Sequence, residues 1–108
     1  MTIACPDLEE SLRNELRSWL CCALANVLAL PTKSTLASRD RASVLLGIAR
    51  TRHTIDAVLL YASECWEVAQ THTISPMTLA FADSAAAMCR LLEEEVKSVQ
   101  DTVMNITC

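Results

Sequence analysis

The sequence contains a single glycine, Gly47, and only three prolines, Pro6, Pro31 and Pro76. Loops that hold phosphate groups need several glycines, because their backbone N–H groups must come close to the ligand. The scarcity of glycine therefore excludes the common nucleotide-binding loops. The scarcity of glycine and proline also favours long helices, because both residues destabilise a helix interior.

Aromatic residues make up only 4% of the chain, and there is no long hydrophobic run. The longest uncharged stretch, residues 18–32, contains Asn26 and is too short to cross a bilayer. Acidic residues at positions 7, 9 and 10 come before any apolar run, so no signal peptide is expected at this N-terminus. We therefore expect a cytoplasmic protein that does not insert into a membrane.

The six cysteines form no CxxC pair, and the two histidines are 19 residues apart, which gives no zinc signature. Cys21 and Cys22 are adjacent, whereas Cys65 and Cys89 fall on apolar stripes, where a free cysteine behaves as a small hydrophobe. This placement favours free thiols in a reducing compartment over a disulfide framework. We expect no cofactor and no bound metal.

Hydrophobic residues make up 52% of the 108 residues, and the mean hydropathy is +0.28. A chain of this length forms one domain, residues 1–108. Short helices do not easily hide this much apolar surface, so we expect the chain to bind another protein or itself as an oligomer.

The first helix is expected over residues 7–30, where Asp7 and Glu10 have the spacing of a capping box and Pro31 ends the helical pattern. Its apolar residues recur at steps of three and four. They are Leu8, Leu12, Leu16, Trp19, Leu20, Ala23, Leu24, Val27 and Leu28. The stretch from Trp19 to Ala25 is apolar on every side, which is typical of a helix covered on every side.

The second helix is expected over residues 39–72, with Ser38 as its N-cap and Asp40 in its first turn. Ser34 is the alternative start. Gly47 lies inside this helix, where it marks a kink, a close helix crossing or a break. The apolar seam of the second helix consists of Ile48, Thr51, Ile55, Val58, Ala62, Cys65 and Ala69.

The segment Thr73–Pro76 is where one long helical pattern must end and the next begin. Ser75 is a suitable N-cap and Pro76 a suitable first helical residue, while Ile74 and Leu79 have the spacing of a hydrophobic staple. The third helix then extends over residues 76–106. Its seam consists of Ala85, Cys89, Leu92, Val96, Val99, Val103 and Ile106.

Two long helices with matching seams and a tight connection fold back on each other. The predicted fold is therefore all-α, a three-helix antiparallel bundle in which helices two and three form a hairpin. Counting outward from residue 74 places Arg50, Arg52 and His53 opposite the acidic block 93–95. Exposed pairs of this kind select the register more than they stabilise it.

Two kinds of chemistry are weaker alternatives. Glu64, Glu67 and Asp83 could together bind Mg²⁺, as in a metal-dependent nucleotide hydrolase, although a second acidic motif is missing. The basic block over residues 33–52 could bind phosphate or nucleic acid, but the net charge of −4 and the few aromatics argue against that. Cys65 and His72 lie two turns apart, about 10 Å along a helix, which is too far for proton transfer.

The remaining interpretation is a non-enzymatic protein–protein interaction module, such as a chaperone, an adaptor or a structural subunit. Large apolar side chains and tryptophans are the usual anchors of an interface. In the first helix the candidate partner-binding residues are Leu16, Trp19, Leu20, Leu24, Val27 and Leu28. The same residues could instead form the core of the bundle, and the sequence does not separate these two roles.

Overall fold

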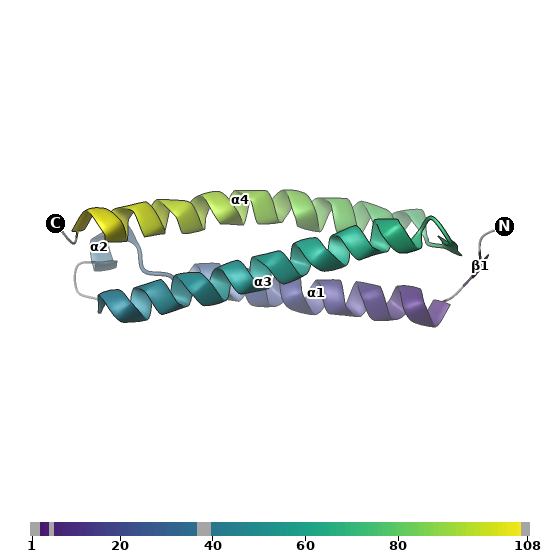
Figure 1. Cartoon of the computed structure of the whole chain (residues 1–108), viewed down its shortest axis with the longest axis horizontal. Coiled ribbons are helices and arrows are strands. Elements are labelled where there is room, and N and C mark those ends of the chain that lie inside the picture. Colours follow the sequence, from purple (N-terminus) through teal and green to yellow (C-terminus); the bar gives the residue numbers. More distant parts are fainter. Residues whose placement is uncertain (1–2, 5, 37–39, 107–108) are drawn as a thin grey trace.

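The computed structural model describes residues 3–4, 6–36 and 40–106 of the chain. Three long helices form an elongated bundle of 60 × 17 × 16 Å (Figure 1). They are α1 (Pro6–Ala29), α3 (Arg41–Val68) and α4 (Pro76–Ile106), and a short helix, α2 (Lys33–Leu36), lies between α1 and α3. The predicted all-α, three-helix antiparallel bundle is confirmed.

Helix α3 runs antiparallel to both α1 and α4, which are parallel to each other (Figure 1). It packs along each of them more extensively than they pack on one another. The seams predicted for α3 and α4 form most of the core. Its fully buried side chains include Ile55, Val58, Cys65, Cys89 and Val96.

Helix α3 begins two residues later than expected, and its N-cap is Asp40. The Asp40 carboxylate accepts hydrogen bonds from the backbone N–H and the hydroxyl of Ser43. A carboxylate at this position satisfies one of the unpaired N–H groups that begin a helix. The predicted cap Ser38 lies outside the described residues, and Ser34 lies within the separate helix α2.

Helix α3 also ends earlier than residue 72, because Val68 is its last residue and Ala69 its C-cap. After a turn at residues 69–71, the strand β2 (His72–Thr73) pairs in parallel with β1 (Ile3–Ala4). This two-residue pairing ties the segment before α1 to the connection between α3 and α4. The sequence pattern did not indicate this pairing of β1 with β2.

The predicted cap of the third long helix is confirmed in detail. The Ser75 hydroxyl accepts a hydrogen bond from the Met77 N–H at 3.2 Å, and Pro76 is the first residue of α4. The Ser75 N–H in turn donates to the carboxylate of Glu9 on α1. This bond places a negative charge at the positive end of α4, so α1 takes part in starting α4.

The predicted charge register is only partly reproduced. Arg52 lines a surface depression with Glu93 and Glu94, but its guanidinium donates to the side-chain carbonyl of Gln100. His53 faces α1, where its ring meets that of Trp19 edge-on with centroids 5.9 Å apart. The basic and acidic blocks are therefore neighbours without the residue-by-residue pairing expected.

Gly47 lies within a continuous α3, so it does not break the helix. A Cβ at this position would meet Leu30 at 3.6 Å, which is ordinary van der Waals contact. We expect Gly47→Ala to raise the free energy of unfolding by about 0.5–1 kcal/mol, because alanine is the better helix former. Urea denaturation measures the gain. A loss of stability would mean that α1 and α3 approach too closely here for a methyl group.

Candidate docking groove

The structure divides the six candidate partner-binding residues of α1 into three groups. Leu16 and Leu20 are buried in the core, Trp19, Leu24 and Val27 are half-buried, and Leu28 is 85% exposed. Leu16 and Leu20 therefore pack within the chain itself and are not accessible to a protein that docks on the folded bundle. Leu28 is the one member of the set that projects into solvent.

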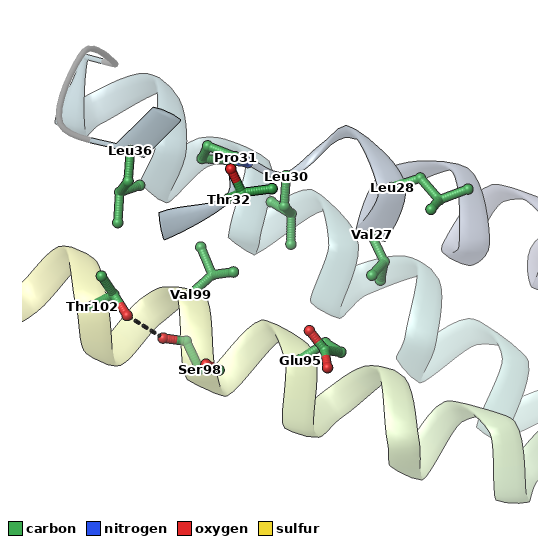
Figure 2. Close-up of a pocket in the computed structure, with 10 residues that line it drawn as sticks. All are labelled: Val27, Leu28, Leu30, Pro31, Thr32, Leu36, Glu95, Ser98, Val99 and Thr102. Atoms are coloured by element: carbon green, nitrogen blue, oxygen red, sulfur yellow. Dashed lines mark hydrogen bonds between the residues drawn. The ribbon is translucent and has the colours of Figure 1, made fainter. Parts of the chain in front are cut away.

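Leu28 lies at the mouth of an apolar groove formed by the end of α1, by α2 and by α4 (Figure 2). The groove has a volume of about 490 Å³. Val27 and Leu28 reach it from α1, Leu30 and Pro31 from the bend that follows, Leu36 from α2, and Val99 from α4.

Local sequence explains why the groove lies here. Pro31 ends α1, and the Thr32 carbonyl then accepts hydrogen bonds from the N–H groups of Thr35 and Leu36 as α2 begins. This turn directs Leu36 into the core, where it is 6% exposed. One end of the gap between α1 and α4 is closed in this way, and the rest stays open.

The α4 side of the groove has a polar rim made of Glu95, Ser98 and Thr102. The Thr102 hydroxyl donates to the Ser98 carbonyl at 2.9 Å, as the dashed line in Figure 2 shows, so this rim group has a partner within its own helix. Glu95 gives the rim a negative charge. An apolar interior with a polar rim is the usual form of a protein–protein contact surface.

Trp19 has a different environment from the groove. Its ring is half-buried between α1 and α3 against His53. Asn26, two turns further along the same face of α1, donates to the Thr54 hydroxyl at 3.3 Å. These contacts join α1 to α3. In this structure Trp19 stabilises the bundle from within, and it is remote from the residues that line the groove.

The acidic residues considered as metal ligands are not gathered into a site. The Asp83 carboxylate accepts a hydrogen bond from the Trp66 indole N–H at 2.7 Å. Within the described residues, no three histidine, cysteine, aspartate or glutamate side chains come together in a way that could hold a metal ion. Asp83 is thus engaged in joining α3 to α4.

Cys65 and His72 also have separate surroundings. Cys65 is fully buried, and its burial, with smaller contributions from Glu64 and Glu9, raises the pKa of the thiol. A raised pKa disfavours the thiolate, which is the nucleophilic form of cysteine. The His72 ring shares a hydrogen bond of 2.9 Å with the hydroxyl of Thr71, so it is engaged in β2, beyond the end of α3.

The basic block is spread over several elements. Lys33 begins α2, whereas Arg41, Arg50 and Arg52 lie on α3, and Arg39 lies outside the described residues. Arg41 contacts the Met104 sulfur at 3.5 Å, and Arg50 lines a shallow depression with Asn26 and His53. Arg50 and Arg52 border separate depressions, so the block does not line a common groove.

Sequence reasoning found Val27 and Leu28 but missed the other apolar lining residues, Leu30, Leu36 and Val99. Leu30 and Leu36 flank Pro31 in a stretch that reads as the end of one helix and a polar connection. Val99 belongs to the predicted seam of the third helix, and the pattern did not indicate that it would border an opening. Pro31 was the available signal in the sequence, because it ends α1 beside the longer helix α4 and so leaves part of α4 uncovered.

Comparison of the chain with known protein families, curated proteins and solved structures finds no significant match in any of the three. None of the helices in the described part of the chain is long and apolar enough to cross a membrane.

Proposed function

We propose that this protein is a non-enzymatic interaction module, a chaperone, an adaptor or a structural subunit, that binds a short amphipathic segment of another protein in the groove between α1, α2 and α4. The observation that carries the proposal is Leu28. Its side chain is 85% exposed and adjoins an apolar groove, so the two together form a contiguous apolar patch, and such a patch, unlike a single exposed leucine, marks an interaction site.

The chemistry of the rim indicates what kind of segment fits. Glu95 is the one charged residue among those that line the groove. A negative charge on the rim of an apolar groove favours a partner helix that presents leucine-like side chains at steps of three and four, flanked by lysine or arginine. The charges would set orientation and association rate, whereas the apolar contacts would supply most of the affinity.

A reducing compartment such as the cytoplasm suits this role. Cys65 and Cys89 are both fully buried, so they serve as packing residues and need no oxidant to complete the fold. Cys21 and Cys22 are exposed on α1 and would be exposed to oxidation outside such a compartment. We place the interaction in the cytoplasm on this ground.

A labelled amphipathic peptide made of leucine and lysine tests the groove directly. We expect Leu28→Ser to weaken its binding about tenfold or more, because burying a leucine contributes about 1.5–3 kcal/mol. Leu60→Ser is the matched control, since Leu60 is 60% exposed on α3, away from the groove. Fluorescence anisotropy measures both affinities.

The location of the peptide is checked by methyl NMR. We expect the signals of Val27 and Val99, which line the groove, to shift on binding, whereas the signal of fully buried Val58 stays in place. A peptide of leucine and glutamate should bind more weakly because of the acidic rim. Equal losses in the Leu28 and Leu60 variants, or shifts confined to other faces, would contradict the proposal.

A further inference from the structure

The first half of α4 carries a second apolar surface, separate from the groove. Five side chains project from this surface, which we name the α4 stripe: Met77, Ala80, Ser84, Met88 and Leu91. All five are exposed, Met77 at 81% and Leu91 at 66%. Their steps of three, four, four and three residues keep them on one face of the helix. The face that α4 buries in the bundle core is a different one, formed around Ala82, Ala85 and Cys89.

The spacing of the α4 stripe reads the same in both directions, with Ser84 at its centre. If two α4 helices pack antiparallel around a two-fold axis at Ser84, Met77 of each copy meets Leu91 of the other, and Ala80 meets Met88. Ala80 then lies opposite the larger Met88, Met77 and Leu91 make apolar contacts at both ends, and the serines at the centre let the two backbones approach. A two-fold contact must be self-complementary in this way, whereas a contact with an unrelated protein has no such requirement.

The α4 stripe itself carries no charge. Between residues 77 and 92 the only charged side chains are Asp83 and Arg90, and both lie on one flank of the stripe. In the antiparallel pair a two-fold axis keeps that flank on one side, so the two copies of Asp83 come closest to each other there. Each of these carboxylates already accepts a hydrogen bond from Trp66 of its own chain.

The ends of the overlap are also complementary. Because α4 begins at Pro76, the overlap centred on Ser84 ends at Leu92 of each copy. Glu95 comes next on the same face of α4, and it would lie just beyond the N-terminus of the other copy's α4. Glu93 and Glu94 instead line the depression with Arg52. Acidic side chains are favourable there, because the N-terminal end of a helix carries a partial positive charge.

We infer that the α4 stripe is a homodimer interface, in which α4 packs antiparallel on α4 of a second copy. Trp66, 47% exposed and hydrogen-bonded to Asp83, widens the apolar face on the α3 side. A stable dimer needs roughly 600 Å² from each partner at the low end. The α4 stripe contributes three large side chains, Met77, Met88 and Leu91, so we expect a dimer near that limit, whose association is weak and depends on concentration.

Sedimentation equilibrium over a wide concentration range tests the interface. The mass should rise from 11.8 kDa towards twice that value and then stay constant, because a two-fold contact closes on itself. Met77→Glu should keep the protein monomeric, since the new charge would face Leu91 and Glu95 of the other copy. It should not harm the fold, because an acid in the first turn of a helix is favourable. Leu60→Glu, on the outer face of α3, is the matched control and should dimerise normally.

Cysteine cross-linking tests the register independently. In a chain whose Cys5, Cys21, Cys22 and Cys108 are replaced by serine, Ser84→Cys should form a disulfide-linked dimer on mild oxidation. Ser63→Cys, exposed on α3, should not. A mass that stays at 11.8 kDa, a mass that keeps rising beyond the dimer, or a dimer that survives Met77→Glu would overturn the inference. Leu28→Ser should leave the dimer intact, so the groove and the α4 stripe are tested separately.

Discussion

Replacing Leu16 by alanine is expected to lower the free energy of unfolding by about 2–5 kcal/mol. Leu16 is fully buried in the middle of α1 and belongs to the core shared with α3 and α4. Truncation removes apolar atoms from this core and leaves a cavity that a rod of three long helices cannot easily close. A domain of this size is stable by about 5–15 kcal/mol, so the loss is a large part of the total.

The matched control is Leu28→Ala, the same substitution three turns further along the same helix. Leu28 is 85% exposed, so its truncation should change stability by no more than about 0.5 kcal/mol. Urea denaturation followed by far-ultraviolet circular dichroism measures both variants. The two leucines cannot be told apart by residue type or by helix, so the contrast depends only on which face of α1 each occupies. Similar losses for both would mean that α1 packs with a different face inward.

The contrast between Leu16 and Leu28 raises the question of which buried faces the sequence predicts. Steps of three and four predicted the buried faces of α3 and α4, because a helix places residues at those steps on one side. Ile48, Thr51 and Ile55 on α3, and Cys89 and Val96 on α4, are all buried as expected. The seams and the cap at Ser75 were enough to predict an antiparallel hairpin.

The role of α1 could not be predicted in the same way. Apolar residues surround this helix between Trp19 and Ala25, so the pattern does not say which side faces the hairpin. The structure settles this by contact: Leu20 and Ala23 enter the core, whereas Cys21 and Cys22 are exposed. A pattern that is apolar all round predicts burial but not direction.

Three features depend on contacts between distant residues, and the sequence pattern was not enough to predict them. The pairing of β1 with β2 involves only two residues on each side, too few for an alternating pattern. The bond from the Ser75 N–H to Glu9 joins positions 66 residues apart. The groove exists because Pro31 stops α1 while α4 continues, and its opening depends on how the three helices are placed.

The spacing of the α4 stripe is present in the sequence, but the longer apolar seam on the same helix is the more prominent pattern. Helix α4 carries two apolar faces, and the longer seam through Cys89, Val96 and Val103 takes up the core position. Only when the core face is known does the second set, with Met77 and Leu91 near its ends, stand out as exposed. Sequence alone could have shown two stripes on one helix without saying which of them is covered.

The core thiol of Cys89 should make the stability of the bundle depend on pH in alkaline solution. Burial, with a smaller contribution from Glu93, raises the pKa of Cys89 from its ordinary value of 9.0 to about 11. The folded state therefore keeps the proton over a range in which the unfolded state has lost it. Since the folded state then binds more protons, stability falls as the pH rises. This contribution is fully present below pH 9 and is lost as the pH rises through about 11.

Comparison of the wild type with Cys89→Ala isolates this contribution, because lysine and tyrosine side chains that titrate in the same range are common to both. At pH 8 we expect the variant to be the less stable of the two, since it leaves a small cavity in the core. The difference should shrink as the pH rises from 9 to 11, by at most about a hundredfold in the unfolding equilibrium constant. Urea denaturation at successive pH values measures it. A difference that stays constant over this range would mean that Cys89 meets water in the folded state, and that the seam between α3 and α4 is more open than the structure shows.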